Sequence, residues 1–207
     1  EISKMSKITN TSVFIPEGSD DATDVAGSSQ IWTLTETPSA LYHTDDTGVK
    51  HRLGTTVSGE FATTSGTTVD LTGIPVGVTR VDVMFEGVSS NGTGEYMLRI
   101  GPSGGVVTSG YQSGSTNGAN ADEDTTSFKL TYGPTAVTGM HGMIQMRLKD
   151  VANNTWVSMG LLSKRTGANL LMVSSGSCSL AASLNKMQLL NTAGNTWDAG
   201  SIALSWS

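Results

Sequence analysis

Three histidines and one cysteine are the residues of this chain whose types are most often used for metal binding or nucleophilic catalysis. His43 and His51 flank a predicted hairpin turn and could approach each other across two strands, but His141 shares no metal-ligand spacing with them. Cys178 stands between two serines, and the nearest histidine in the sequence is His141, a pattern that favours a small strand residue over a nucleophile. The sequence therefore predicts no metal site, no cofactor and no catalytic thiol.

Paired carboxylates are the other candidates for catalysis, because glycoside hydrolysis needs two carboxyl groups about 5 to 10 Å apart in a cleft. The acidic residues that could form such a pair are Glu60, Asp70, Asp82, Glu86, Glu95, Asp122, Glu123, Asp124 and Asp198. No spacing singles out one pair among them. Glycine pairs such as Gly104-Gly105 lack the lysine and the helix of a phosphate-binding loop. The sequence consequently favours a binding or structural role over an enzymatic one.

A candidate binding site follows Tyr111 in the sequence. Sugar recognition commonly combines an exposed aromatic face with nearby amide and carboxylate groups. The residues that offer these groups are Tyr111, Gln112, Asn117, Asn120 and Asp122, which we expect to contact a glycan. Residues 113–124 are poor in apolar side chains and are predicted to form an exposed, variable loop. In the alternative interpretation, Tyr111 fills the edge of a sheet and this loop is only solvated.

The charge of the chain argues against several classes of partner. The formal net charge is −6, and the 12 basic residues are scattered. Nucleic-acid affinity depends on clustered Lys and Arg, so we expect no nucleic-acid binding. No run approaches the roughly 18 consecutive apolar residues of a membrane-spanning helix, and the first residues do not lead into the apolar core of a signal peptide. We therefore expect no membrane insertion.

The composition predicts an all-β protein built from short strands. Hydrophobic residues make up 37% of the chain, charged residues only 14%, and there are 25 glycines. The predicted strands after residue 55 are 57–62, 67–71, 79–88, 95–100, 106–112, 125–132, 140–149, 155–162, 169–174, 184–190 and 201–206. Such a series, separated by turn signals, favours an antiparallel β-sandwich of the jelly-roll kind.

Two strands have the clearest alternation of apolar and polar residues. In one, Val81, Val83 and Phe85 share a face, and in the other Ile144 and its alternate neighbours do so. Turn residues 90–94 predict a hairpin between strands 79–88 and 95–100, and turn residues 150–154 predict a second hairpin between strands 140–149 and 155–162.

The chain is predicted to have three parts. Residues 1–29 form an extended attachment segment whose short apolar cluster is Val13, Phe14 and Ile15. This segment cannot bury enough apolar area to offset its ordering entropy, so we expect it to dock on another protein. Residues 30–56 form a small hairpin connector, and residues 57–207 form the outer β-sandwich. A hairpin of this size is marginal alone, which predicts that several chains associate.

Several stretches of the sequence resemble those of a known family. The stretches are residues 65–75 (SGTTVDLTGIP), 78–81, 83–85, 87–92, 104–105 and 196–202 (TWDAGSI), with residues 37–48 before them. Their order is similar to that of the C-terminal β-domain of tailed-bacteriophage tail-fibre and head-fibre (spike) virion proteins. The resemblance spans about two-thirds of the chain and consists of turns and strands, so it bears on fold more than on any ligand.

This resemblance implies a virion protein, exposed on the phage particle, that is usually a homotrimer and contacts the host surface. The absence of a long shaft favours a compact spike or capsid decoration over a long tail fibre. A threefold axis could also gather three copies of His43 or His51, although ordinary surface histidines are the simpler interpretation. We expect a structural, non-enzymatic protein used for receptor binding and host attachment through a glycan. The alternatives are a glycan-depolymerising tailspike-type enzyme with carboxylates between subunits, and a carbohydrate-binding module.

Overall fold

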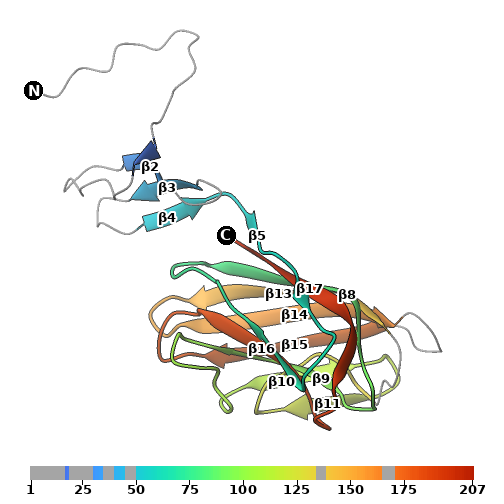
Figure 1. Cartoon of the computed structure of the whole chain (residues 1–207). Helices are drawn as coiled ribbons and strands as arrows, with labels where there is room; N and C mark the ends of the chain where they lie inside the picture. Colours follow the sequence, from blue (N-terminus) through green and yellow to red (C-terminus); the bar gives the residue numbers. More distant parts are fainter. Residues whose placement is uncertain (1–16, 19–29, 35–39, 45–49, 134–138, 165–170) are drawn as a thin grey trace, which may run out of the picture. The chain divides into compact units, whose positions relative to one another are not determined.

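A computed structural model describes residues 17–18, 30–34, 40–44, 50–133, 139–164 and 171–207 of the chain. Within these residues every regular element is a β-strand. The chain divides into two compact units, Glu1–Gly54 and Thr55–Ser207, which are taken here one at a time. Figure 1 labels most of the strands along the chain.

The N-terminal unit contains a four-stranded sheet with the order β1-β2-β3-β4. Its strands are β1 (Glu17–Gly18), β2 (Gln30–Leu34), β3 (Ala40–Thr44) and β4 (Lys50–Leu53). Strand β1 pairs in parallel with β2, and the remaining pairs are antiparallel. The short strands expected after residue 30 are thus confirmed, and His43 and His51 are register partners in β3 and β4. The predicted anchor residues Val13, Phe14 and Ile15 lie outside the described residues.

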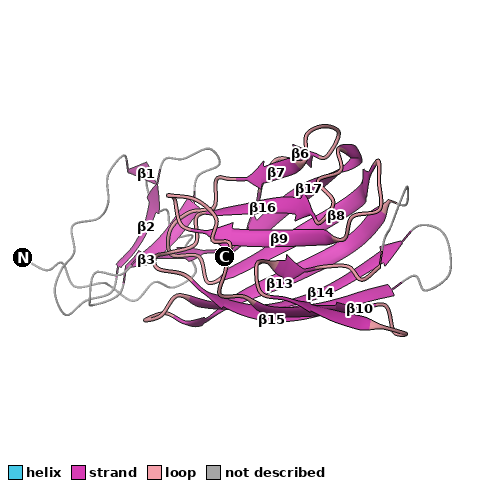
Figure 2. Ribbon diagram, turned by 90° about the horizontal axis from the view of Figure 1, so that it is seen from below, coloured by secondary structure: helices cyan, strands magenta, loops and turns pink. Residues whose placement is uncertain are grey.

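The second unit consists of two antiparallel sheets, which confirms the predicted β-sandwich. The larger sheet has the order β11-β10-β15-β14-β13-β8-β17-β5, with β6 also paired to β17, and the smaller has the order β12-β9-β16-β7. The strands are β5 (Thr56–Val57), β6 (Phe61–Ala62), β7 (Thr68–Leu71), β8 (Arg80–Ser90), β9 (Tyr96–Gly101), β10 (Gln112–Thr116), β11 (Ala121–Asp124), β12 (Phe128–Lys129), β13 (Met140–Asp150), β14 (Thr155–Lys164), β15 (Leu171–Ser179), β16 (Lys186–Asn191) and β17 (Trp197–Trp206). Figure 2 shows β9 and β16 in one layer and β13, β14 and β15 in the other.

The core lies between these two sheets because alternate residues of each long strand turn inward. Val81 and Val83 of β8 are fully buried, as are Leu98 of β9 and Leu189 of β16. The alternation predicted for β13 is confirmed, since Ile144 and Met146 are buried while Arg147 and Lys149 are exposed. Burial of this apolar surface is the main favourable contribution to folding.

One predicted hairpin is confirmed and the other is wrong. Strands β13 and β14 pair directly through a tight turn, as expected. Strands β8 and β9, however, belong to different sheets, so residues 90–94 carry the chain from one sheet to the other. The turn is held by a loop distant in sequence: Asn195 Oδ1 accepts a hydrogen bond from the Gly94 N–H (3.0 Å), and Asn91 Oδ1 accepts one from the Thr196 N–H (3.1 Å). Turn residues specify a reversal of direction, but they do not specify which strand the chain then pairs with.

The segment from residue 102 to residue 124 also differs from its prediction. Residues 106–111 form no strand, and β10 begins only at Gln112. Residues 113–124, expected as a loop, form most of the β10–β11 hairpin. Their side chains are mostly Ser, Thr, Gly and Asn, whose small differences in hydropathy give no visible alternation. Cys178, by contrast, is a buried residue of β15, as its small neighbours suggested.

Candidate functional site

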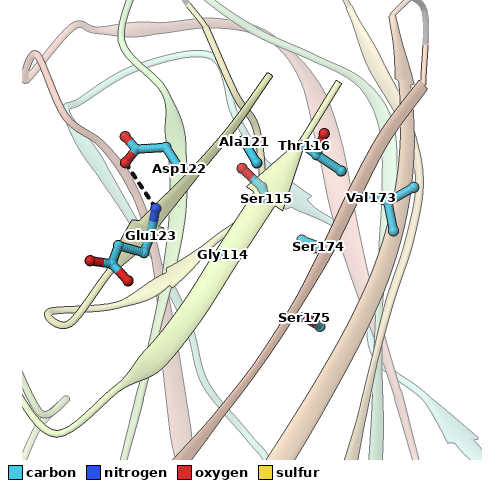
Figure 3. A pocket seen from close by; sticks show the side chains of 9 residues that line it. All are labelled: Gly114, Ser115, Thr116, Ala121, Asp122, Glu123, Val173, Ser174 and Ser175. Atoms are coloured by element: carbon cyan, nitrogen blue, oxygen red, sulfur yellow. Dashed lines mark hydrogen bonds between the residues drawn. The ribbon is translucent and has the colours of Figure 1, made fainter. Parts of the chain in front are cut away.

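An open hollow lies on the β10–β11 hairpin where it meets β15, and it is the best candidate binding site in the second unit (Figure 3). Its volume is about 610 Å³. The lining residues are Gly114, Ser115, Thr116, Ala121, Asp122, Glu123, Val173, Ser174 and Ser175. Three strands therefore contribute to the hollow, and β15 is brought to it only by sheet pairing.

The strand register explains why this surface is recessed. Gly114 pairs with Glu123 on β11 and with Ser175 on β15. Residues at paired positions share one face of a sheet. Because Gly114 has no side chain, the floor between Glu123 and Ser175 is backbone. The next row, formed by Val173, Thr116 and the small Ala121, is also low. A run of small residues on neighbouring strands thus makes the hollow.

The tip of the hairpin is fixed by its own hydrogen bonds. Asn117 Oδ1 accepts hydrogen bonds from the N–H groups of Ala119 (3.0 Å) and Asn120 (2.9 Å). The Thr116 hydroxyl donates to the Asn120 carbonyl (2.7 Å) and accepts from the Gly118 N–H (3.0 Å). Gly118 has φ of +88°, which favours glycine at this position. The tip is therefore an ordered turn in which Asn117 has a structural role.

A buried lysine ties the hairpin to the smaller sheet. The Lys129 side chain is 4% exposed, and its Nζ lies 2.5 Å from Asp122 Oδ2 and 2.7 Å from Glu95 Oε2. Burial alone lowers the pKa of Lys129, but the hydrogen bonds and charges of Asp122 and Glu95 outweigh it, so this pKa is raised. The hydrogen bond from Lys129 lowers the pKa of Asp122. Asp122 is therefore an ionised part of the scaffold at neutral pH.

The carboxylates of β11 differ in how many hydrogen bonds they accept from neighbouring groups. Asp124 Oδ1 accepts hydrogen bonds from both the N–H and the hydroxyl of Thr126 and of Ser127. Asp122 Oδ1 accepts one from the Glu123 N–H at 2.9 Å, drawn as the dashed line in Figure 3. Within the described part of the chain, the exposed Glu123 carboxylate has no hydrogen bond or ion pair. Glu123 is accordingly the carboxylate that a ligand in the hollow can reach.

The expectation that Tyr111 offers an exposed aromatic face is wrong. Its side chain is 1% exposed and packs edge-on against Phe128, with ring centroids 5.0 Å apart. Its hydroxyl accepts a hydrogen bond from the Ile100 N–H (2.8 Å) and lies within donating distance of the carbonyls of Ile100 (3.2 Å) and Val107 (3.1 Å). Burial raises the pKa of Tyr111. Beyond the short pairing of β9 with β12, the Ile100 N–H has no strand partner among the described residues, and the Tyr111 hydroxyl accepts its hydrogen bond.

The other candidate residues have different places on the same hairpin. Gln112 is exposed at the start of β10, Asn120 is exposed at the tip, and Asp122 lines the hollow. Sequence reasoning named Glu123 only among the possible catalytic carboxylates and did not name Gly114, although both fall inside the segment that it singled out for glycan binding. It also missed the contribution of β15, because only strand pairing brings Ser175 beside Gly114.

A second hollow, of about 430 Å³, lies where β8, β13 and β17 meet. Glu60, Glu86 and His141 line it together with Met84, Phe85, Ser201 and Ala203. Nδ1 of His141 accepts a hydrogen bond from the Gly87 N–H at 3.3 Å, which orients the imidazole ring. Two carboxylates from the predicted set thus share one hollow.

The searches for other kinds of site give negative findings for the described residues only. In the ranges given above, no cluster of three or more His, Cys, Asp or Glu side chains is arranged to hold a metal ion. Over the same ranges there is no helix with the length and apolarity needed to cross a membrane. Comparisons with protein-family models, with curated proteins and with solved structures find no match to this chain.

Proposed function

We propose that this chain is a structural, non-enzymatic protein of a bacteriophage virion, displayed as a homotrimeric fibre, spike or capsid decoration, and that its β-sandwich binds a host-surface glycan in the hollow on the β10–β11 hairpin. The observation that carries the binding proposal is the accessible carboxylate of Glu123 beside a recessed floor of small residues. The virion assignment is supported by the resemblance of residues 65–75 and 196–202 to phage fibre domains.

The chemistry of the hollow suits a sugar chain. The Glu123 carboxylate and the exposed Ser175 hydroxyl can hydrogen-bond adjacent sugar hydroxyls, and the half-exposed Val173 offers an apolar contact for sugar C–H groups. The hollow is open, so an internal unit of a long polysaccharide can enter it. The Lys129–Asp122 ion pair holds the hairpin in place without using the Glu123 carboxylate.

A binding assay with Glu123→Gln tests this assignment. Affinity for host lipopolysaccharide or capsular polysaccharide, measured by biolayer interferometry with the full chain, is expected to fall at least about tenfold, because the variant loses a charged hydrogen-bond acceptor. Asp70→Asn is the matched control, since Asp70 is exposed on β7 and lines neither hollow. Equal affinities for Glu123→Gln and the unmodified chain would exclude this hollow as the glycan site.

The virion role has a separate test. Phage particles assembled with a chain lacking residues 1–29 are expected to lack the protein, because the anchor is proposed to lie in that segment. The truncated chain should still give the circular dichroism of a folded β-protein. Particles that retain the truncated protein would overturn the anchoring role of residues 1–29.

Glycan hydrolysis is the second candidate function, and the shared hollow of Glu60 and Glu86 is the observation that favours it. Incubation of the full chain with the polysaccharide, followed by chromatography of released oligosaccharides, distinguishes the two functions. The adhesion proposal expects no release. Release that disappears in Glu60→Gln and Glu86→Gln would instead establish a depolymerase.

A further inference from the structure

An exposed apolar patch lies on the outer face of the larger sheet, next to the hollow. It consists of Met143 on β13, Met159 and Leu161 on β14, and Leu171 and Val173 on β15, with 37%, 61%, 52%, 55% and 48% of each residue exposed. These residues are contiguous, because Met143 pairs with Leu161 and Leu161 pairs with Val173, while Met159 and Leu171 lie two positions along the same face. We call these five residues the apolar patch.

The apolar patch has both raised and recessed parts. A trough of about 480 Å³ passes between its side chains, with Gly142 and Gly160 contributing backbone to the lining. Met159, the most exposed member of the apolar patch, is one of the residues that line it. A surface with apolar projections next to an apolar trough is suited to interdigitate with a surface of the same kind, as packed β-sheets do.

Charged side chains flank the apolar patch on opposite sides. Arg147 and Lys149 are exposed on β13, and Glu123 is exposed on β11. The strand order places β13 on one side of β14–β15 and β11 on the other. Because the net charge of the chain is −6, the basic flank of one copy is attracted to the acidic surface of the next copy. This pattern fits a second copy of the same chain better than a lipid surface, because the chain has a net charge of −6.

The area of the apolar patch is sufficient to contribute the centre of a stable interface. With about 180 Å² for a fully exposed aliphatic residue, the five exposed fractions amount to on the order of 450 Å², a size at which the largest apolar patch of a protein is often functional. A stable interface buries about 800 Å² on each partner. The apolar patch would supply more than half of that area, and the basic residues Arg147 and Lys149 would supply part of the rim.

We propose that the apolar patch is the surface on which a second copy of this chain packs, with Arg147 and Lys149 at its rim and the Glu123 carboxylate left free for the glycan hollow. The inference rests on the homotrimer of the proposed function and identifies the surface that forms it. Val173 belongs to both the apolar patch and the glycan hollow, so each hollow would lie beside a boundary between subunits.

Sedimentation velocity of the full chain, from about 1 to about 100 µM, tests the proposal. The unmodified chain is expected to form an oligomer, and Val173→Glu and Met159→Glu are each expected to weaken association at least about tenfold, because each places a charge in an apolar contact. Val76→Glu is the matched control, since Val76 is 75% exposed and lies outside the patch. All three positions are well exposed, and circular dichroism is expected to show an unchanged fold.

Three results would overturn the proposal. One is a monomer at every concentration, and another is association that persists unchanged in both patch variants. The third is a monomer that cosediments with phosphatidylcholine vesicles and loses this binding in Met159→Glu, which would identify a lipid surface as the occupant. Glu123→Gln provides the separate measure of glycan adhesion, so loss of the oligomer in Met159→Glu and loss of glycan binding in Glu123→Gln can be distinguished.

Discussion

The hydroxyl of Tyr111 is expected to stabilise the sandwich, and Tyr111→Phe removes only that group. The aromatic ring keeps its packing against Phe128, so no cavity forms. The change leaves the Ile100 N–H, which lies 2.8 Å from the hydroxyl, without its buried partner. An unsatisfied buried donor costs about 1–3 kcal/mol, and we expect the free energy of unfolding to fall by that amount.

This loss corresponds to a decrease in Tm of roughly 2 to 12 °C for a chain of this size, measurable by calorimetry or by thermal circular dichroism. Tyr132→Phe is the control, because Tyr132 is only partly buried, and its effect should stay below about 0.5 kcal/mol. Glycan affinity should be unchanged in Tyr111→Phe at temperatures where both proteins are folded. Unchanged stability together with lost glycan binding would refute the assignment of Tyr111 to the core.

Three more predictions concern the backbone, the Lys129–Asp122 ion pair and the thiol. Gly200→Ala should lower the free energy of unfolding, measured by urea titration, by more than about 2 kcal/mol, because φ of Gly200 is +90° and a Cβ there would lie 2.4 Å from the backbone of β8. Gly104→Ala is the control: a Cβ at Gly104 meets nothing within 4 Å, so this variant should be nearly neutral. Since Lys129 lowers the pKa of Asp122, the ion pair stabilises the fold above the ordinary carboxyl pKa of about 3.9, and this contribution is lost as the pH falls through the lowered pKa. The difference in unfolding free energy between the unmodified chain and Asp122→Asn should therefore shrink between about pH 5 and pH 3. A difference that stays constant over this range would contradict the pairing. Burial raises the pKa of Cys178 to about 11, so alkylation by iodoacetamide at pH 8 should be at least about tenfold slower in the native protein than in urea, and equal rates would show that the thiol is accessible.

The parts of the fold that the sequence predicted are those in which burial imposes an alternation. Strand β13 has Ile144, Met146 and Leu148 on the core side and polar residues between them, so the alternation predicted both the strand and the face that it turns inward. The turn after it is short, and consecutive antiparallel strands joined by such a turn normally pair. The same reasoning failed for β8 and β9, because both flank a turn rich in Asn and Gly but lie in different sheets.

The candidate site was predicted only in part because its residues are small and polar. Ser113 and Ser115 turn inward and Gly114 and Thr116 do not, yet this alternation is invisible to a hydropathy pattern. Tyr111 was misplaced for a related reason. An aromatic residue before a polar segment is equally compatible with an exposed sugar-binding platform and with a core residue. Tyr111 is a core residue because its hydroxyl accepts the hydrogen bond of the Ile100 N–H, at the edge of β9 beyond its pairing with β12. The contribution of β15 depends on long-range pairing, which single-sequence patterns do not report.

The inward and outward faces of the larger sheet place different requirements on its sequence. Its inward positions must be apolar or small to pack against β9 and β16, so they specify the fold and leave little freedom for function. Its outward positions carry no such demand, yet five of them on β13, β14 and β15 hold exposed Met, Leu or Val, although charged residues are usual on a solvated sheet face. Exposed apolar side chains reduce solubility, and the proposed association offsets that cost by burying them. If so, Tyr111→Phe, Glu123→Gln and Met159→Glu should each impair a different property, namely stability, glycan binding and association. A single variant on the outer face that impaired all three without unfolding the protein would show that fold and surface are not separable in this way.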